Sequence, residues 1–218
     1  MEDALDDFLS GQDVKVHKRA KRLLALLREA YPHGVPALLL KSHTDRLGAA
    51  AGHAFHLGTP DRELRRIASW LLTHGEQDTW ELCRLVPMLW ARHGREDCIL
   101  AALLLANLRP PLEPVGSDAW AVLIGIVGEV ESAETLLFAI EEFHRAKIPA
   151  PEESVLLRMM GEGGVRAHLG LLIHHSIWLR EGRGPLSEDA LNAIQGVAMP
   201  AGDSLLGRVR DQLLGAAA

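Results

Sequence analysis

The stretch "WELCRLVPMLWARHGREDCILAALLLANL", residues 80–108, decides the fold class of this chain. Its first half predicts an amphipathic helix that runs from a cap at Asp78 towards His93, because apolar residues recur at helical spacing. The apolar face consists of Leu82, Val86 and Leu89. Pro87 lies inside this helix and has no backbone N–H, so we expect a kink there.

The second half of the stretch predicts a helix of another kind. Gly94 ends the first helix, and "CILAALLLA", residues 98–106, then follows with apolar residues on every side. A helix without a polar face is packed on more than one side. We therefore expect residues 98–106 to lie in the interior of the fold.

The same helical spacing continues on both sides of this stretch, and no segment alternates with the period of two that a half-buried strand requires. Thr59 is the expected N-cap of the preceding helix, which runs to Gly75, and Pro60 is its expected first residue. The other predicted helices are a short one after residue 35 and those spanning residues 13–31, 44–57, 117–127, 132–147, 151–160, 165–180, 187–197 and 203–214.

The order of these helices indicates the architecture. Amphipathic helices alternate with more uniformly apolar ones, which is typical of a HEAT-like helical-repeat solenoid, where each inner helix is covered by the repeats before and behind it. A compact helical bundle is the alternative, because the spacing of the candidate repeats is irregular. We predict one all-α domain over residues 1–218, in which the acidic segment 1–12 need not pack against the rest.

The overall charge restricts the partners of the chain. It carries 23 Lys and Arg against 29 Asp and Glu, a net charge of −6, so DNA binding requires positive charge concentrated on one face. The first residues lack the pattern of a signal peptide, and no apolar run is long enough to span a bilayer. Both cysteines, Cys83 and Cys98, lie in apolar helical runs. These features favour a cytoplasmic protein with no membrane partner.

One segment does concentrate positive charge. Residues 15–28 carry six Lys and Arg and no acid. This pattern is typical of a surface that follows phosphates, and it is equally that of a solvated helix face whose charge is offset by the acids of residues 2–13. For a DNA-binding protein, the candidate contacts are Lys15, Lys18, Arg19, Arg22, Arg65, Arg66 and Arg92.

The tryptophans supply candidate aromatic contacts. Trp80 lies well round the helix from the apolar face and close to Arg84, so we expect it to point outward as a stacking or interface residue. Trp120 and Trp178 are further candidates. Packing in the core is the alternative for each of the three.

The sequence predicts no catalytic residue, metal site or cofactor. His53 and His56 can share a helix face, as can His168 and His175, but neither pair has the further converging ligands that a zinc site needs. The segment "GEGG", residues 161–164, is expected to form a loop with no strand before it, which excludes a nucleotide-binding glycine loop.

Residues 53–130 resemble the DNA alkylation-repair glycosylases, a family built from HEAT-like helical pairs. The family's "G-x-x-x-P-x-x-R" start is similar to "HLGTPDRELRRIASWLL" in this chain. Its "LW" helix, charged turn and Ala- and Leu-rich helix are similar to "VPMLWARHGREDCILAALLLANL", and its "W-x-x-x-D" helix to "SDAWAVLIGIVGEV". The positions that carry the resemblance are Gly58, Pro60, Arg65, Leu89, Trp90, Arg95 and Trp120.

The resemblance implies DNA binding without the family's reaction. The family has a catalytic Asp one helical turn after this Trp, and this chain has Ile124 there. The nearest carboxylates, Asp118 and Glu129, are out of register for the same helical face. The segment "SIWLREG", with Trp178 and Arg180, matches the family's later Trp-containing helix only in part, and the family's "W-x-R-R" helix has no counterpart.

Three functions are consistent with these observations. The first is a HEAT-like protein that binds duplex DNA and lacks glycosylase chemistry. The second is a protein-interaction scaffold that holds a protein partner in its concave face and has no nucleic-acid role. The third is an active alkylpurine DNA glycosylase that uses a carboxylate outside the expected register, such as Asp118 or Glu129.

Overall fold

The computed structural model describes residues 3–35, 52–75, 79–108, 119–200 and 204–215. Within these ranges the regular elements are α-helices and one short 3-10 helix. Phe55 and Gly94 form an isolated β-bridge. The predicted all-α class is confirmed. The chain divides into two compact units, Met1–Asp118 and Ala119–Ala218, which are described separately below although the sequence predicts one domain.

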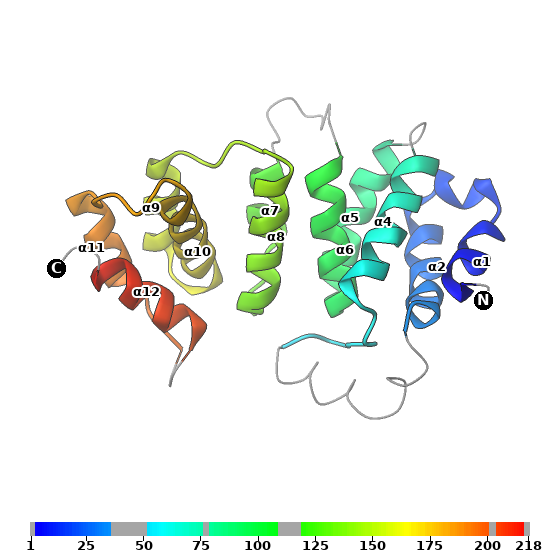
Figure 1. Ribbon diagram of the computed structural model, residues 1–218, viewed down its shortest axis with the longest axis horizontal. Coiled ribbons are helices and arrows are strands. Elements are labelled where there is room, and N and C mark those ends of the chain that lie inside the picture. Colours follow the sequence, from blue (N-terminus) through cyan, green and yellow to red (C-terminus); the bar gives the residue numbers. More distant parts are fainter. Residues whose placement is uncertain (1–2, 36–51, 76–78, 109–118, 201–203, 216–218) are drawn as a thin grey trace. The chain divides into compact units, whose positions relative to one another are not determined.

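The first unit is built around three neighbouring helices, α4, α5 and α6, with α2 packed against α5 (Figure 1). Its elements are α1 (Ala4–Ser10), the 3-10 helix η1 (Val14–Lys18), α2 (Ala20–His33), α4 (Asp61–His74), α5 (Thr79–Arg92) and α6 (Arg95–Asn107). Helix α6 contacts both α4 and α5, so it has neighbours on more than one side.

Helix α6 is the interior of this unit, as its sequence predicts. Every residue from Cys98 to Ala106 is buried. The burial continues into the charged first turn, where Glu96 and Asp97 are both 0% exposed. The prediction of an all-round buried helix is confirmed, but it did not extend to these two acids.

The N-terminal segment, which the sequence did not require to pack against the rest, is part of the packed unit in its described residues 3–12. Asp3 caps α1 by accepting the backbone N–H groups of Leu5 and Asp6. Leu5 and Leu9 are buried, and α1 contacts α2. The acids of this segment remain outside while its two leucines join the core, which is the usual division of an amphipathic helix.

Two helix boundaries differ from the prediction. The helix expected over residues 13–31 is broken at Arg19, whose extended backbone separates η1 from α2. The helix after Pro60 starts at Asp61 with Pro60 as its N-cap, and the hydroxyl of Thr59, the predicted cap, donates instead to the carbonyl oxygen of Tyr31 (3.1 Å). Helix α5 contains Pro87, as the sequence predicts, and the side chain of this proline is exposed.

The helix predicted over residues 44–57 is not formed in its described part. Residues 36–51 lie outside the described ranges, and residues 52–58 are non-helical. They run beside the α5–α6 turn: the N–H of Ala54 donates to the carbonyl oxygen of His93 (2.8 Å), and the N–H of Arg95 to that of Phe55 (3.0 Å). Phe55 lies so close that a Cβ on Gly94 would be 2.1 Å from its ring, so this turn requires glycine.

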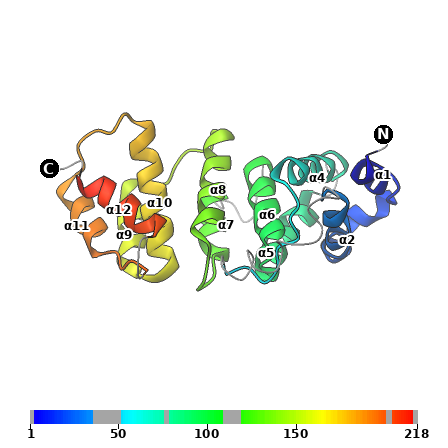
Figure 2. The ribbon, with the colours of Figure 1, turned by 60° about the horizontal axis from the view of Figure 1, so that its bottom comes forward.

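In the second unit, α10 packs against α8, α9 and α12 (Figure 2). Its elements are α7 (Ala119–Ile126), α8 (Ala133–Arg145), α9 (Glu153–Glu162), α10 (Gly164–Arg180), α11 (Glu188–Gly196) and α12 (Leu205–Gly215). The predicted loop at residues 161–164 is wrong for all but Gly163, whose positive φ of 76° turns the chain directly from α9 into α10. None of the described helices is long and apolar enough to cross a bilayer.

Candidate nucleic-acid interface

The positively charged run folds into two short elements with a defined junction. The Asp13 carboxylate accepts the N–H of Lys15 (2.9 Å) and starts η1. Arg19 then extends the chain, and the first N–H of α2, on Ala20, donates to a carboxylate oxygen of Glu81 (2.7 Å). Since Glu81 belongs to α5, this cap places the first turn of α5 beside the η1–α2 junction.

Five side chains of this run form what we call the basic surface: Lys15, Lys18, Arg19, Lys21 and Arg22. All five are exposed, and none forms an ion pair with an acid among the described residues. The run between the first and the last of them contains no carboxylate. The predicted positive segment is therefore an accessible surface whose charge is not neutralised within the described part of the chain.

Arg66 does not add to this surface, although the sequence places it among the DNA contacts. Its guanidinium binds the carboxylates of Asp3 (2.8 Å), Asp6 (2.5 Å) and Glu63. The hydrogen bonds to Asp3 and Asp6 raise the pKa of Arg66, and the hydrogen bond from Arg66 in turn lowers the pKa of Asp3. Arg66 ties α1 to α4, and its charge is compensated.

Arg92 is likewise a structural residue rather than a phosphate contact. Its Nε and Nη2 atoms donate to the two carboxylate oxygens of Asp97, both at 2.5 Å, and its Nη1 donates to the carbonyl oxygen of Leu24 (2.7 Å). The ring of Phe55 lies 5.8 Å from the guanidinium carbon. With 19% of its side chain exposed, Arg92 joins α5 to α6 and α2.

The Arg92–Asp97 pair belongs to a buried polar network that the sequence did not reveal. The hydroxyl of Tyr31 donates to Asp97 (2.7 Å), and burial together with the Asp97 charge raises the pKa of Tyr31 well above its usual value. The neighbouring carboxylate of Glu96 accepts the N–H groups of Leu57 and Gly58, both at 2.9 Å, and of Thr59 at 3.3 Å. The two acids thus fix the segment before α4 and the C-terminal half of α2. The sequence offered one indication of a structural role for these acids. Both lie in the first turn of α6, where the positive end of the helix dipole stabilises negative side chains.

Arg65 completes the set of predicted contacts. It is half-buried on α4 and engaged in an interaction of its own. Of the seven predicted basic contacts, Lys15, Lys18, Arg19 and Arg22 are thus exposed along η1 and the first turn of α2, and the other three have different roles or surroundings.

Of the three candidate tryptophans, Trp80 is exposed, and Trp120 and Trp178 are buried. Trp80 is 58% exposed in the first turn of α5, which confirms its outward direction. Trp120 is 1% exposed: its indole N–H donates to the carbonyl oxygen of Pro149 (2.9 Å), and its ring packs edge-on against Phe143. Trp178 is 6% exposed and donates to the carbonyl oxygen of Gly184 (2.8 Å). Trp120 therefore has no face left for stacking, whereas Trp178 lines a pocket of its own unit.

Another cavity, of about 350 Å³, opens in the first unit beside the basic surface. His17 from η1 and Trp70 and His74 from α4 form its aromatic wall, with the His17 and Trp70 rings 4.5 Å apart. His17 precedes Lys18 in η1, so the wall and the basic surface share one element. Sequence reasoning missed this cavity because its residues come from separate helices.

Ile124 stands where the resembling glycosylase family has its catalytic Asp, and Glu129 and Asp118 are the nearest carboxylates in the sequence. Ile124 is half-buried in α7, and Glu129 is exposed in the segment that follows this helix. Asp118 lies outside the described residues.

Comparison of the chain with protein-family models, with curated proteins and with solved structures gives no match.

Proposed function

We propose that this chain is a HEAT-like helical-repeat protein that binds the phosphate backbone of duplex DNA through the basic surface and does not cleave the glycosidic bond. The observation that carries the proposal is the group of five exposed cations, Lys15 to Arg22, without an ion pair to a described acid. Lys and Arg that contact phosphates release condensed counterions, which is the main source of sequence-independent affinity for DNA.

The sequence resemblance supports the same proposal from another direction. The likeness to the alkylation-repair glycosylases centres on the α5–α6 pair, with Leu89, Trp90 and Arg95. In this chain Leu89 and Trp90 are buried, and Arg95 binds Asp61 (2.8 Å). Leu89 and Trp90 are core residues of α5, and the Arg95–Asp61 pair joins α6 to α4, so the shared pattern concerns the scaffold and leaves the chemistry open.

Charge reversal of the basic surface tests DNA binding. The variant Lys18→Glu/Arg19→Glu/Arg22→Glu should bind duplex DNA more weakly, and the dependence of log affinity on log salt should flatten by roughly one unit per lost phosphate contact. The fold should be kept, because the three side chains are exposed. A mobility-shift titration at several salt concentrations measures both quantities.

The matched control reverses three exposed cations elsewhere: Arg62, Lys147 and Arg158. This variant has the same net charge as the first, so it should retain the wild-type salt slope if the effect belongs to the basic surface. Retention of DNA by the wild type no better than by an acidic control protein at low salt would exclude the proposal.

The chain should not release alkylated purines from DNA above the background rate. In such a reaction a carboxylate stabilises the positive charge that develops on the sugar, and Ile124 cannot supply one. A base-release assay on methylated duplex DNA measures this directly. Excision that disappears in Asp118→Ala or Glu129→Ala would instead identify an active glycosylase.

A protein-interaction scaffold is the second candidate, favoured by Trp80, which is 58% exposed on a chain of net charge −6. Exposed tryptophans are enriched at protein interfaces. This function predicts no DNA binding at low salt and a protein partner whose binding is lost in Trp80→Ala.

A further inference from the structure

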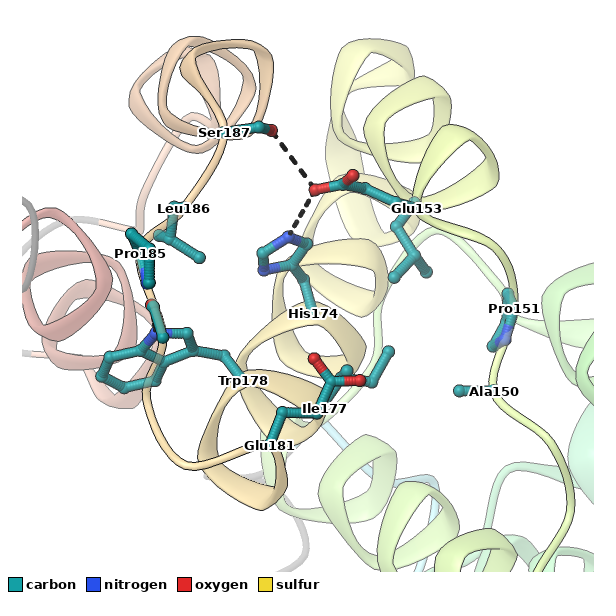
Figure 3. Close-up of a pocket in the computed structure, with 12 residues that line it drawn as sticks. Ala150, Pro151, Glu153, His174, Ile177, Trp178, Glu181, Pro185, Leu186 and Ser187 are labelled. Carbon is teal, nitrogen blue, oxygen red and sulfur yellow. Dashed lines mark hydrogen bonds and ion pairs between the residues drawn. The ribbon is translucent and has the colours of Figure 1, made fainter.

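The cavity beside the basic surface, which we call the aromatic pocket, has no part in the proposed contact with phosphates. It has a volume of about 350 Å³ and lies between α1, η1 and α4. Pockets for small organic molecules have roughly 300–1,000 Å³, so this one has room for one flat ring system. The larger cavity of the second unit, of about 430 Å³, is lined by Glu153 and Glu181 and by no Lys or Arg, so it offers no cation to a phosphate (Figure 3).

The three rings of the aromatic pocket form a stack that reaches the surface. His17 is 2% exposed, and its ring lies 4.5 Å from that of Trp70 and 5.5 Å from that of His74, with only 18° between the two imidazole planes. Trp70 is half-buried and His74 is exposed. Nδ1 of His74 donates to the carbonyl oxygen of Trp70 (2.9 Å), which orients the imidazole. A further planar group can pack against the exposed end of this stack.

The 3-10 helix η1 places the pocket next to the cations. Such a helix has about three residues per turn, so side chains three positions apart lie in one row. Val14 and His17 form the row that lines the pocket, and Lys15 and Lys18 form a neighbouring, exposed row. Val14 is 65% exposed, so apolar surface at the pocket is open to a partner. A nucleotide whose phosphate lies on the lysine row therefore has its base next to the pocket.

The polar lining of the pocket favours a neutral ring over an anion. Arg66 lines the pocket, but three carboxylates already bind it, and that of Asp6 lines the pocket as well. A phosphate inside would meet a negative charge and an occupied cation. The Gln12 amide nitrogen donates to the carbonyl oxygen of Phe8 (2.8 Å), which leaves the amide oxygen to accept a hydrogen bond from the edge of a base.

We infer that the aromatic pocket holds an unpaired base of DNA, stacked on the exposed ring of His74, while the adjoining phosphates lie on the row of Lys15 and Lys18. The inference rests on the proposed function and narrows it to DNA that contains an unpaired base. A base inside a duplex enters a pocket only after the cost of unpairing and unstacking is met. Bases stack on aromatic side chains with little dependence on sequence, so the pocket accepts any of the four.

The test compares three duplexes of one sequence by fluorescence anisotropy: fully paired, with one unpaired adenine, and with an abasic residue in place of that adenine. The unpaired adenine should strengthen binding at least about fivefold over both others, the lower end of what one stacked base contributes. The abasic duplex controls for flexibility at the bulge. Equal affinity for the adenine and abasic duplexes would overturn the inference and leave DNA binding in place, whereas failure to bind all three would overturn both.

Variants at the exposed end of the stack assign the preference to the pocket. His74→Ala should reduce it by about threefold or more and leave affinity for the paired duplex unchanged, and His74→Phe, which keeps a ring, should retain most of it. The matched control is His168→Ala, because His168 also donates to a backbone carbonyl oxygen, that of Ala198 (2.9 Å), and lies outside the pocket. An unchanged preference in His74→Ala, or an equal loss in His168→Ala, would contradict the inference.

The charge-reversal variant of the basic surface separates the two sites. It should weaken binding of all three duplexes and keep the preference for the unpaired adenine, because its three substitutions lie outside the pocket. Loss of the preference in this variant would mean that it comes from the cations and not from the aromatic pocket.

A nucleoside without a phosphate locates the base directly. Titration of the full chain with 2′-deoxyadenosine, followed by ¹H–¹⁵N NMR, should give saturable shifts of the Trp70 indole N–H and of amides in residues 12–18 and 70–75. Ribose 5-phosphate should leave the Trp70 indole signal unchanged. A shift of this signal by ribose 5-phosphate and none by the nucleoside would place the phosphate in the pocket and overturn the inference.

Discussion

Replacement of Asp97 by Ala is expected to lower the free energy of unfolding by about 3–5 kcal/mol, the usual cost of removing one partner of a buried ion pair. Asp97 is 0% exposed and accepts two hydrogen bonds from Arg92 and one from Tyr31. The variant leaves a largely buried guanidinium and a buried hydroxyl without their acceptor. Chemical denaturation followed by circular dichroism measures the loss, and hydrogen exchange locates it in the first unit.

Two further variants separate this effect from a general loss of charge. Glu162→Ala breaks an exposed pair with Arg166 (3.2 Å) and should cost about 0.5 kcal/mol or less. Arg92→Met combined with Asp97→Leu removes both charges together, and it should be more stable than Asp97→Ala alone because no unpaired charge remains buried. A loss below about 1 kcal/mol in Asp97→Ala would contradict the structural role given to this network.

Leu104→Ala should destabilise the protein by about 2–5 kcal/mol, because it removes buried methyl groups and leaves a cavity in a close-packed interior. Leu104 is 0% exposed in the middle of α6, which has α4 and α5 as neighbours. Denaturant titration with a common m-value gives the difference between the variant and the wild type.

The matched control is the same substitution at Leu205, which is 37% exposed at the start of α12. This change should cost well under half as much, because less apolar area returns to water and no closed cavity forms. If the two substitutions had equal effects, α6 would not be the interior helix that its burial indicates.

The sequence by itself determined the all-α class, most helix positions and the burial of α6. These properties depend on local spacing: residues 98–106 have no polar side chain in any direction, so burial on all sides is the favourable solution whatever the neighbours are. It also predicted that Trp80 points outward and that residues 15–22 carry a positive surface, because both follow from the helical position of nearby residues.

The tertiary structure decided which charges and aromatic rings are available for a partner. Arg66 and Arg92 have the same appearance in sequence as Arg19 and Arg22, but the first two meet carboxylates and the second two meet solvent. Two of those carboxylates are distant in the chain: Arg66 pairs with Asp3 and Asp6, which lie 63 and 60 positions before it. Pairing at such a distance depends on how helices pack, and helix periodicity carries no information about it.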